Sequence, residues 1–221
     1  MTTKRNLPSK DEIALMPTFV GLTLEHVHVP TSKEEFAAAT IDIKAAGIVG
    51  FDTESKPTFS VGEVSSGPHV VQFALHDRAY LFQVHRAEGL PFLSELLRSE
   101  EVIKVGFGLK SDRGHIFKKF GIQFGGVVDL NVVFSKQGHM KEMGVRNGVG
   151  LVFRQRFAKS RKITTTDWSQ HELTPQQILY AANDAYAALK VFAALDLRLE
   201  ELPIMGVVQT QQDSDKTGVL E

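Results

Sequence analysis

Residues 174–195 predict one long helix with a clearly marked start. The run Thr174-Pro175-Gln176-Gln177 supplies an N-cap hydroxyl, a proline at the first helical position and a capping-box glutamine. Tyr180 and Asp184 follow, four residues apart and therefore on one helical face. Outside that face we expect one continuous buried stripe, because apolar residues recur every three or four positions at Ile178, Ala182, Ala185, Leu189, Phe192 and Leu195.

The chain before this helix alternates between strand and helix patterns. Residues 48–54, 70–75 and 79–84 are patterned as strands, and a short polar turn joins the last two as a hairpin. Ser32 and Glu35 form a capping box for a helix ahead of the first strand, and Gly47 is placed to end it. Helical spacing then marks residues 91–98 and 111–120, and short strands mark residues 102–106 and 127–130. An antiparallel start followed by helix-strand alternation predicts an α/β fold with a mixed sheet flanked by helices.

The length of 221 residues fits one sizeable domain. We expect that domain at residues 25–202, between an N-terminal extension at 1–24 and a polar C-terminal tail at 203–221. No apolar run approaches the roughly 20 residues that cross a bilayer, and the N-terminus lacks the apolar segment of a signal peptide. We therefore expect a cytoplasmic protein that has no membrane partner.

The composition restricts the available chemistry. Because the chain has no cysteine, any metal must be held by carboxylates, imidazoles or water. A net charge of -1 gives no overall attraction to nucleic acid, so such binding needs a local basic patch or bound cations. One basic cluster exists, and a solvated helix end explains it about as well as phosphate binding does. Its members are Arg154, Arg156, Lys159, Arg161 and Lys162.

Acidic residues mark the end of the first predicted strand. Since side chains alternate along a strand, Asp52 and Glu54 share one face while Phe51 and Thr53 point to the other. Paired carboxylates repel each other unless a cation lies between them, whereas on a strand running into solvent they would be harmless. The apolar strand before them and their place at its carboxyl end favour a ligand site. Asp112, at the start of a predicted helix, is by spacing alone more typical of a cap.

Three short motifs follow one another along the chain. They are Gly-Phe-Asp-Thr-Glu-Ser-Lys-Pro at residues 50–57, Lys-Val-Gly-Phe-Gly-Leu-Lys-Ser-Asp at 104–112 and Tyr-Ala-Ala-Asn-Asp-Ala at 180–185. Together they resemble the motifs of DEDDy-type 3′-5′ exonucleases, namely the relatives of the Werner syndrome helicase exonuclease domain and, more distantly, ribonuclease D. The resemblance extends over about residues 25–199 and includes Trp168-Ser169 ahead of the last motif.

This resemblance implies an RNase H-like fold and a metal-dependent 3′-5′ exonuclease. It implies two divalent cations, Mg²⁺ or Mn²⁺, held by the carboxylates of Asp52, Glu54, Asp112 and Asp184. A sister branch of the family has a histidine five residues before the final aspartate, where this chain has Leu179. Tyr180 is therefore assigned the role of orienting the attacking water.

The implied substrate is the 3′ end of DNA or RNA, cleaved to nucleoside 5′-monophosphates. We expect Lys159, Arg161 and Lys162 to contact its phosphates. Phe107 and Phe59 are candidates for stacking on a terminal base, with core packing as the alternative use of both. The sequence does not choose between the two nucleic acids, and it names no protein partner.

Two other functions were weighed. The first is a non-catalytic nucleic-acid-binding module on the same scaffold, and the intact set of four carboxylates argues against it. The second is a dinucleotide loop at Gly106-Phe107-Gly108, but Ser111 stands where the fingerprint needs its third glycine. The exonuclease therefore remains the function that the residues favour.

Overall fold

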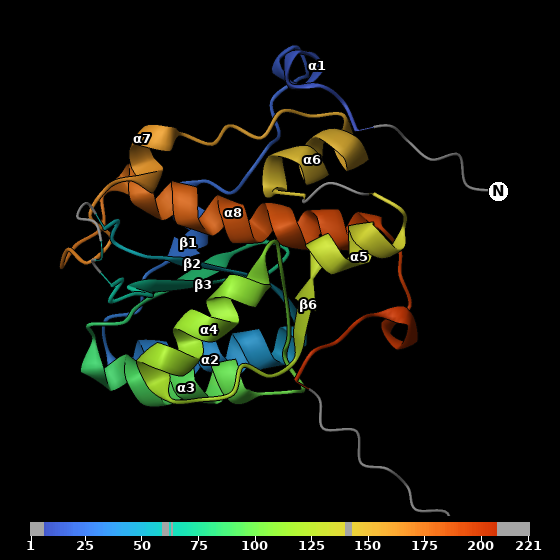
Figure 1. The fold of residues 1–221 in the computed structure, drawn as a ribbon. Helices are drawn as coiled ribbons and strands as arrows, with labels where there is room; N and C mark the ends of the chain where they lie inside the picture. The colour runs from blue at the N-terminus through green and yellow to red at the C-terminus, as the bar shows by residue number, and fades with distance from the viewer. Residues whose placement is uncertain (1–6, 59–61, 63, 140–142, 207–221) are drawn as a thin grey trace, which may run out of the picture.

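The computed structural model describes residues 7–58, 62, 64–139 and 143–206, which form one sheet with helices on both faces (Figure 1). Its six strands lie in the order β1-β4-β3-β2-β5-β6. Neighbours β4, β3 and β2 are antiparallel, whereas β5 and β6 run parallel to β2, and β1 runs parallel to β4. The predicted mixed sheet is thus confirmed, with strands β1 (Val27–His28), β2 (Ile48–Glu54), β3 (Val70–Ala74), β4 (Ala79–Gln83), β5 (Ile103–Gly106) and β6 (Val127–Asp129).

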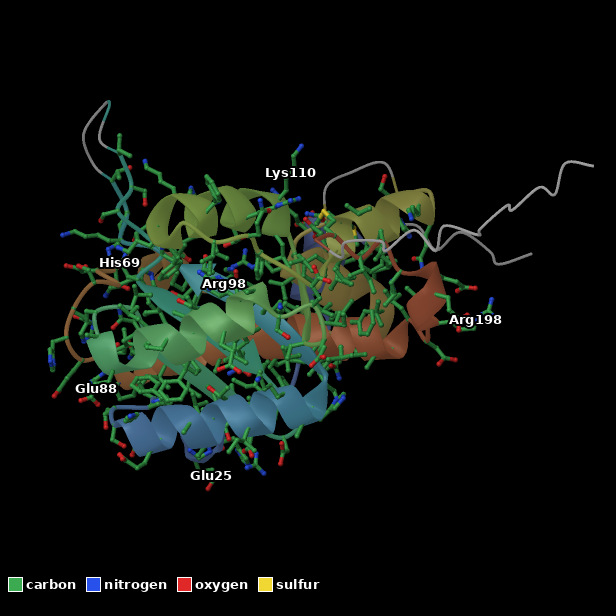
Figure 2. All side chains as sticks on the ribbon, turned by 90° about the horizontal axis from the view of Figure 1, so that it is seen from below. Glu25, His69, Glu88, Arg98, Lys110 and Arg198 are labelled. Carbon is green, nitrogen blue, oxygen red and sulfur yellow. The ribbon has the colours of Figure 1, made fainter. Side chains whose placement is uncertain are left out.

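Helices cover both faces of the sheet. On one face α2 (Lys33–Ala46) and α3 (Leu90–Arg98) lie side by side, as both views show (Figures 1 and 2). On the other face α8 (Pro175–Ala194) crosses the strands, with α6 (Val145–Phe153) packed against it. The other elements are α1 (Lys10–Ala14), α4 (Leu109–Phe120), α5 (Leu130–Lys136), α7 (Arg161–Thr164) and the 3₁₀ turns Leu24–His26, Ala87–Gly89 and Leu199–Glu201. Within the described ranges, no helix combines the length and apolar character that crossing a bilayer requires.

The helix ends follow the local sequence signals. Ser32 and Thr174 each accept a hydrogen bond from the backbone of the third helical residue, in the predicted capping boxes of α2 and α8. Gly47 ends α2 with a positive φ of 67°, a conformation that other residues rarely adopt. These short-range predictions are confirmed because each depends on residues that are neighbours in the chain.

The predicted apolar stripe of α8 is too narrow. Of its predicted members, Ile178 and Leu195 are only partly buried, and the other four are buried. Ala181, Ala187, Ala188 and Val191 are buried as well, because the helix lies between the sheet and α6. Because alanine side chains are small, the sheet and α6 can both approach the helix closely. Asp184, which was expected off the stripe, is only 3% exposed.

The segment before residue 25 packs on the domain. Leu22 is buried, and its backbone N–H and carbonyl pair with the side-chain amide of Asn183 at 2.7 and 3.1 Å. Phe19 packs against the apolar cluster around α6. Residues 19–22 are therefore attached to α8 beside Asp184, while the domain limits of 25 and 202 stay a prediction.

Candidate active site

Strand β2 delivers two carboxylates to the α8 face of the sheet. Val49 and Phe51 pack into the core beneath α2 and α3, so the alternate residues Asp52 and Glu54 point the other way. Glu54 is buried and Asp52 is half-buried. Both lie at the carboxyl end of the strand, where ligands bind in open α/β sheets.

A glycine brings the third carboxylate within reach. Gly50 shares the face of Asp52, and a Cβ at Gly50 would lie 2.0 Å from the carbonyl oxygen of Ala185. Only the missing side chain allows the backbone of α8 to rest on β2 at this point. Because Asp184 precedes Ala185, its carboxylate is held over the end of β2. Sequence reasoning missed Gly50, although a glycine inside a strand is a known sign of close backbone approach.

Three carboxylates converge here. Asp52, Glu54 and Asp184 each offer one oxygen atom, and these oxygens lie within 4.8 Å of one another. Burial, together with the charge of neighbouring acids, raises the pKa of Asp52 to about 8 and that of Glu54 to about 9. Burial also raises the pKa of Asp184, against the opposing effect of Lys159. The group is therefore costly to ionise without a compensating cation.

Asp112 approaches this group from the opposite side of the sheet. It lies in the first turn of α4, and its Oδ1 accepts a short hydrogen bond from the Thr53 hydroxyl. Burial raises the pKa of Asp112, while the bond from Thr53 lowers it. Its charge in turn helps to raise the pKa of Asp52. Asp112 is therefore close enough to Asp52 to act on its charge, but it is not one of the three acids whose oxygens converge. Thr53, which the sequence analysis did not single out, orients it.

Tyr180 lines the same site one turn before Asp184. Its ring packs on buried Trp168 with centroids 5.9 Å apart, and its hydroxyl is hydrogen-bonded to the Thr164 hydroxyl at 2.8 Å. Burial, followed by the nearby charge of Asp184, raises the pKa of Tyr180 to about 12. The phenol therefore stays protonated at neutral pH and can donate a hydrogen bond.

The predicted basic cluster is divided by the fold. Arg161 and Lys162 lie exposed on α7, whereas Lys159 turns inward, and its Nζ lies 2.6 Å from Oδ2 of Asp184. Lys159 and Arg161 also line a cavity of about 330 Å³ together with Arg146, Asn147 and Thr164. Phosphate contacts by Lys159, Arg161 and Lys162 stay a prediction.

Phe107 is placed for packing. Its ring stacks on Phe134 with centroids 6.3 Å apart, and its Cζ lies 2.5 Å from where Gly148 would carry a Cβ. These contacts supply the alternative use that was weighed for Phe107. Phe59 lies outside the described residues.

The converging acids fit a hard divalent cation. Carboxylate oxygens are the ligands that Mg²⁺ and Mn²⁺ prefer. Oδ2 of Asp184 pairs with Lys159, whereas its buried Oδ1 has no hydrogen-bond donor in good geometry among the described residues. Buried acceptors without donors are rare in folded proteins, so they indicate a missing ligand. Asp52, Glu54 and Asp184 would hold it directly, with Asp112 at their border.

Known proteins are similar to this chain in sequence or in fold. A sequence model described as 3′-5′ exonuclease matches residues 27–200. The chain is 30% identical over 150 residues to the mouse bifunctional 3′-5′ exonuclease/ATP-dependent helicase WRN, an alignment that covers 67% of this chain and 11% of that protein. The solved EXO domain of Aedes aegypti Nibbler has a TM-score of 0.68 at 22% identity, covering 80% of this chain and 90% of that one. Escherichia coli RNase D has a TM-score of 0.67 at 21% identity, covering 76% and 44%.

Proposed function

The chain belongs to the 3′-5′ exonuclease family, and from that premise we propose that it is a metal-dependent enzyme removing nucleotides from the 3′ end of a nucleic acid. Its products would be nucleoside 5′-monophosphates. The observation that carries the proposal is the convergence of Asp52, Glu54 and Asp184 within 4.8 Å at the carboxyl end of β2. A surface without catalytic function has no need to bury three mutually repelling acids.

Each residue of the site has a definite task in this proposal. Asp52, Glu54 and Asp184, with Asp112 beside them, would hold two Mg²⁺ or Mn²⁺ ions. When bound, such ions lower the pKa of a water molecule and neutralise charge on the phosphate. The protonated hydroxyl of Tyr180 would orient the attacking water, since it lies one helical turn from Asp184. Thr164 holds that hydroxyl in place at 2.8 Å.

The substrate would be gripped beside the acids. Arg146 and Arg161 line the cavity of about 330 Å³ that adjoins Lys159, and cations in a concave site attract phosphates. RNase D of Trypanosoma brucei, which has the same fold at 19% identity, has been solved in complex with an RNA, U12. We propose that this chain likewise takes a nucleic-acid 3′ end, DNA or RNA.

A time course on oligonucleotides labelled at the 5′ end tests the proposal. Matched DNA and RNA strands are incubated with Mg²⁺, with Mn²⁺ or with a chelator. We expect a ladder that shortens from the 3′ end with either metal, no cleavage with the chelator, and far slower shortening for Asp52→Asn. A purified chain that binds the strands but never shortens them would instead favour the non-catalytic nucleic-acid-binding module.

A further inference from the structure

Lys159 makes a contact that a phosphate-binding lysine does not need. Its Nζ lies 2.6 Å from Oδ2 of Asp184, whose side chain is 1% exposed. Among the described residues, no other lysine or arginine forms an ion pair with Asp52, Glu54, Asp112 or Asp184. The single ammonium therefore lies against a carboxylate that is a candidate metal ligand.

The side chain is held there from several directions. The Lys159 ammonium lies 5.1 Å from the centre of the Tyr180 ring, close enough for a cation–π contact. The guanidinium of Arg146 donates a hydrogen bond to the Lys159 backbone carbonyl, which fixes the chain at that residue. The Lys159 side chain is 29% exposed, so water screens its charge only in part. These contacts make the ion pair a defined feature of the fold.

We infer that Lys159 is the resident counterion of the carboxylate group and that a divalent cation competes with its ammonium for Asp184. The inference rests on the proposed function in one respect, namely that these acids bind metal. A metal ion bound at Asp184 Oδ2 would lie beside the Lys159 ammonium, and the two like charges would repel each other. The ammonium therefore opposes metal binding at this oxygen until it moves away.

The displaced ammonium has a place to go. Lys159, which pairs with Asp184, also borders the cavity of about 330 Å³ lined by Arg146, Arg161 and Thr164. A substrate phosphate held in this cavity would offer the ammonium a new partner. As metal and nucleic acid bind, the Lys159 ammonium would leave Asp184 and pair with a substrate phosphate instead. Until then it would reduce the repulsion among the acids.

Metal titration by calorimetry tests the inference without measuring turnover. Lys159→Met keeps the length of the side chain and removes its charge. Lys190→Met is the matched control, because Lys190 also lies over a tyrosine ring, 5.8 Å from that of Tyr186, and forms no ion pair among the described residues. Mg²⁺ is titrated at about pH 8.5, where protons compete less for the acids. We expect Lys159→Met to bind Mg²⁺ roughly tenfold more tightly and the control to match the wild type.

Thermal unfolding supplies a second readout. Without metal, Lys159→Met should unfold at a lower temperature than the wild type, and saturating Mg²⁺ should raise its unfolding temperature by a larger amount. Should Lys159→Met fail to fold, Lys159→Arg, which keeps the charge, is compared with Lys159→Gln. Unchanged or weaker Mg²⁺ binding in the uncharged variants overturns the inference. A chain that cleaves nothing but shows tighter binding refutes the proposed function alone.

Discussion

Two lysine side chains lie at opposite ends of the same parallel strands, one fully buried and one half-buried, and their surroundings differ. Lys104 lies near the amino end of β5, is fully buried, and donates hydrogen bonds to the backbone carbonyls of Leu96 and Ser99 at 3.0 and 2.6 Å. Lys159 lies at the carboxyl end against Asp184. Burial lowers the pKa of Lys104 to about 7, with Glu100 opposing this shift. Burial also lowers the pKa of Lys159, but Asp184 and Asp52 outweigh it, so that pKa lies above its ordinary value.

The two lysines therefore have different roles: Lys104 stabilises the fold, whereas Lys159 lies at the candidate active site. At the amino end the lysine serves the protein by pairing carbonyls at the end of α3. At the carboxyl end the acids outnumber the one ammonium that pairs with them, so Asp52 and Glu54 stay protonated at neutral pH unless a further cation binds. Acids that ionise only with an added cation are expected where a ligand or substrate supplies it.

The largest expected effect is on turnover and is confined to the carboxyl end of the parallel strands. Asp52→Asn should lower the rate of 3′-end cleavage by roughly 10²–10³-fold, because it removes a ligand of the metal ions that would stabilise transition-state charge. It should not lower the unfolding temperature without metal, since it removes a buried acid that is costly to ionise. Lys104→Met should leave the rate per folded molecule unchanged. A comparable loss of rate in both variants would remove the distinction between the two ends.

The next effect is on the packing that brings the acids together. Gly50→Ala should lower the free energy of unfolding by about 1–3 kcal/mol, because the new methyl group would overlap the Ala185 carbonyl. It should also lower turnover by moving Asp184 away from Asp52. Denaturant unfolding and a cleavage assay on the same samples check both expectations.

A glycine in open surroundings is the control for this substitution. A Cβ at Gly114, inside α4, would meet nothing within 4 Å. Gly114→Ala should therefore stabilise the protein by up to about 1 kcal/mol through the better helix propensity of alanine. If Gly50→Ala behaved in the same way, the close approach of α8 to β2 would be refuted.

A contact in this molecule can be predicted from the sequence when the two residues that make it are close together in the chain. The capping boxes at Ser32 and Thr174 lie within four residues of their partners, so sequence alone identified them. Strand alternation likewise placed Asp52 and Glu54 on one face. The bond from Thr53 to Asp112 joins residues 59 positions apart, and no local pattern encodes it. The direction of the Lys159 side chain depends on how the segment between α6 and α7 packs over α8. The basic run in the sequence could therefore suggest that Lys159 contacts phosphates, but it could not show that Lys159 pairs with Asp184.

In the absence of metal, the contributions of Asp52 and Lys104 to the free energy of unfolding should change with pH in opposite directions. The folded-state pKa of Asp52, about 8, lies above its ordinary 3.8, so its contribution to stability is present at low pH and lost as pH rises towards 8. The folded-state pKa of Lys104, about 7, lies below its ordinary 10.5, so the unfolded chain binds the extra proton and stability increases with pH between those values.

Urea unfolding at a series of pH values, with chelator present, separates the two contributions. Asp52→Asn should reduce the loss of stability between about pH 4 and 8, and Lys104→Met should remove the gain between about pH 7 and 10.5. Each variant should leave the other contribution in place, because the two groups lie at opposite ends of the sheet. Parallel curves for wild type and both variants would contradict the assignment of these groups.

The smallest expected effect concerns a buried amide next to the acids. Gln72 lies opposite Asp52 in the β2–β3 register and is fully buried, yet its side-chain oxygen and nitrogen have no hydrogen-bond partner among the described residues. Since an unpaired buried amide is costly, Gln72→Leu should raise the metal-free free energy of unfolding by about 1 kcal/mol. Lys104, whose ammonium has two carbonyl partners, offers no such gain when replaced. A Gln72→Leu variant that unfolds more easily would mean that the amide has a hydrogen-bond partner in solution. The buried polar groups at the carboxyl end of the strands would then be as fully hydrogen-bonded as Lys104 at the amino end.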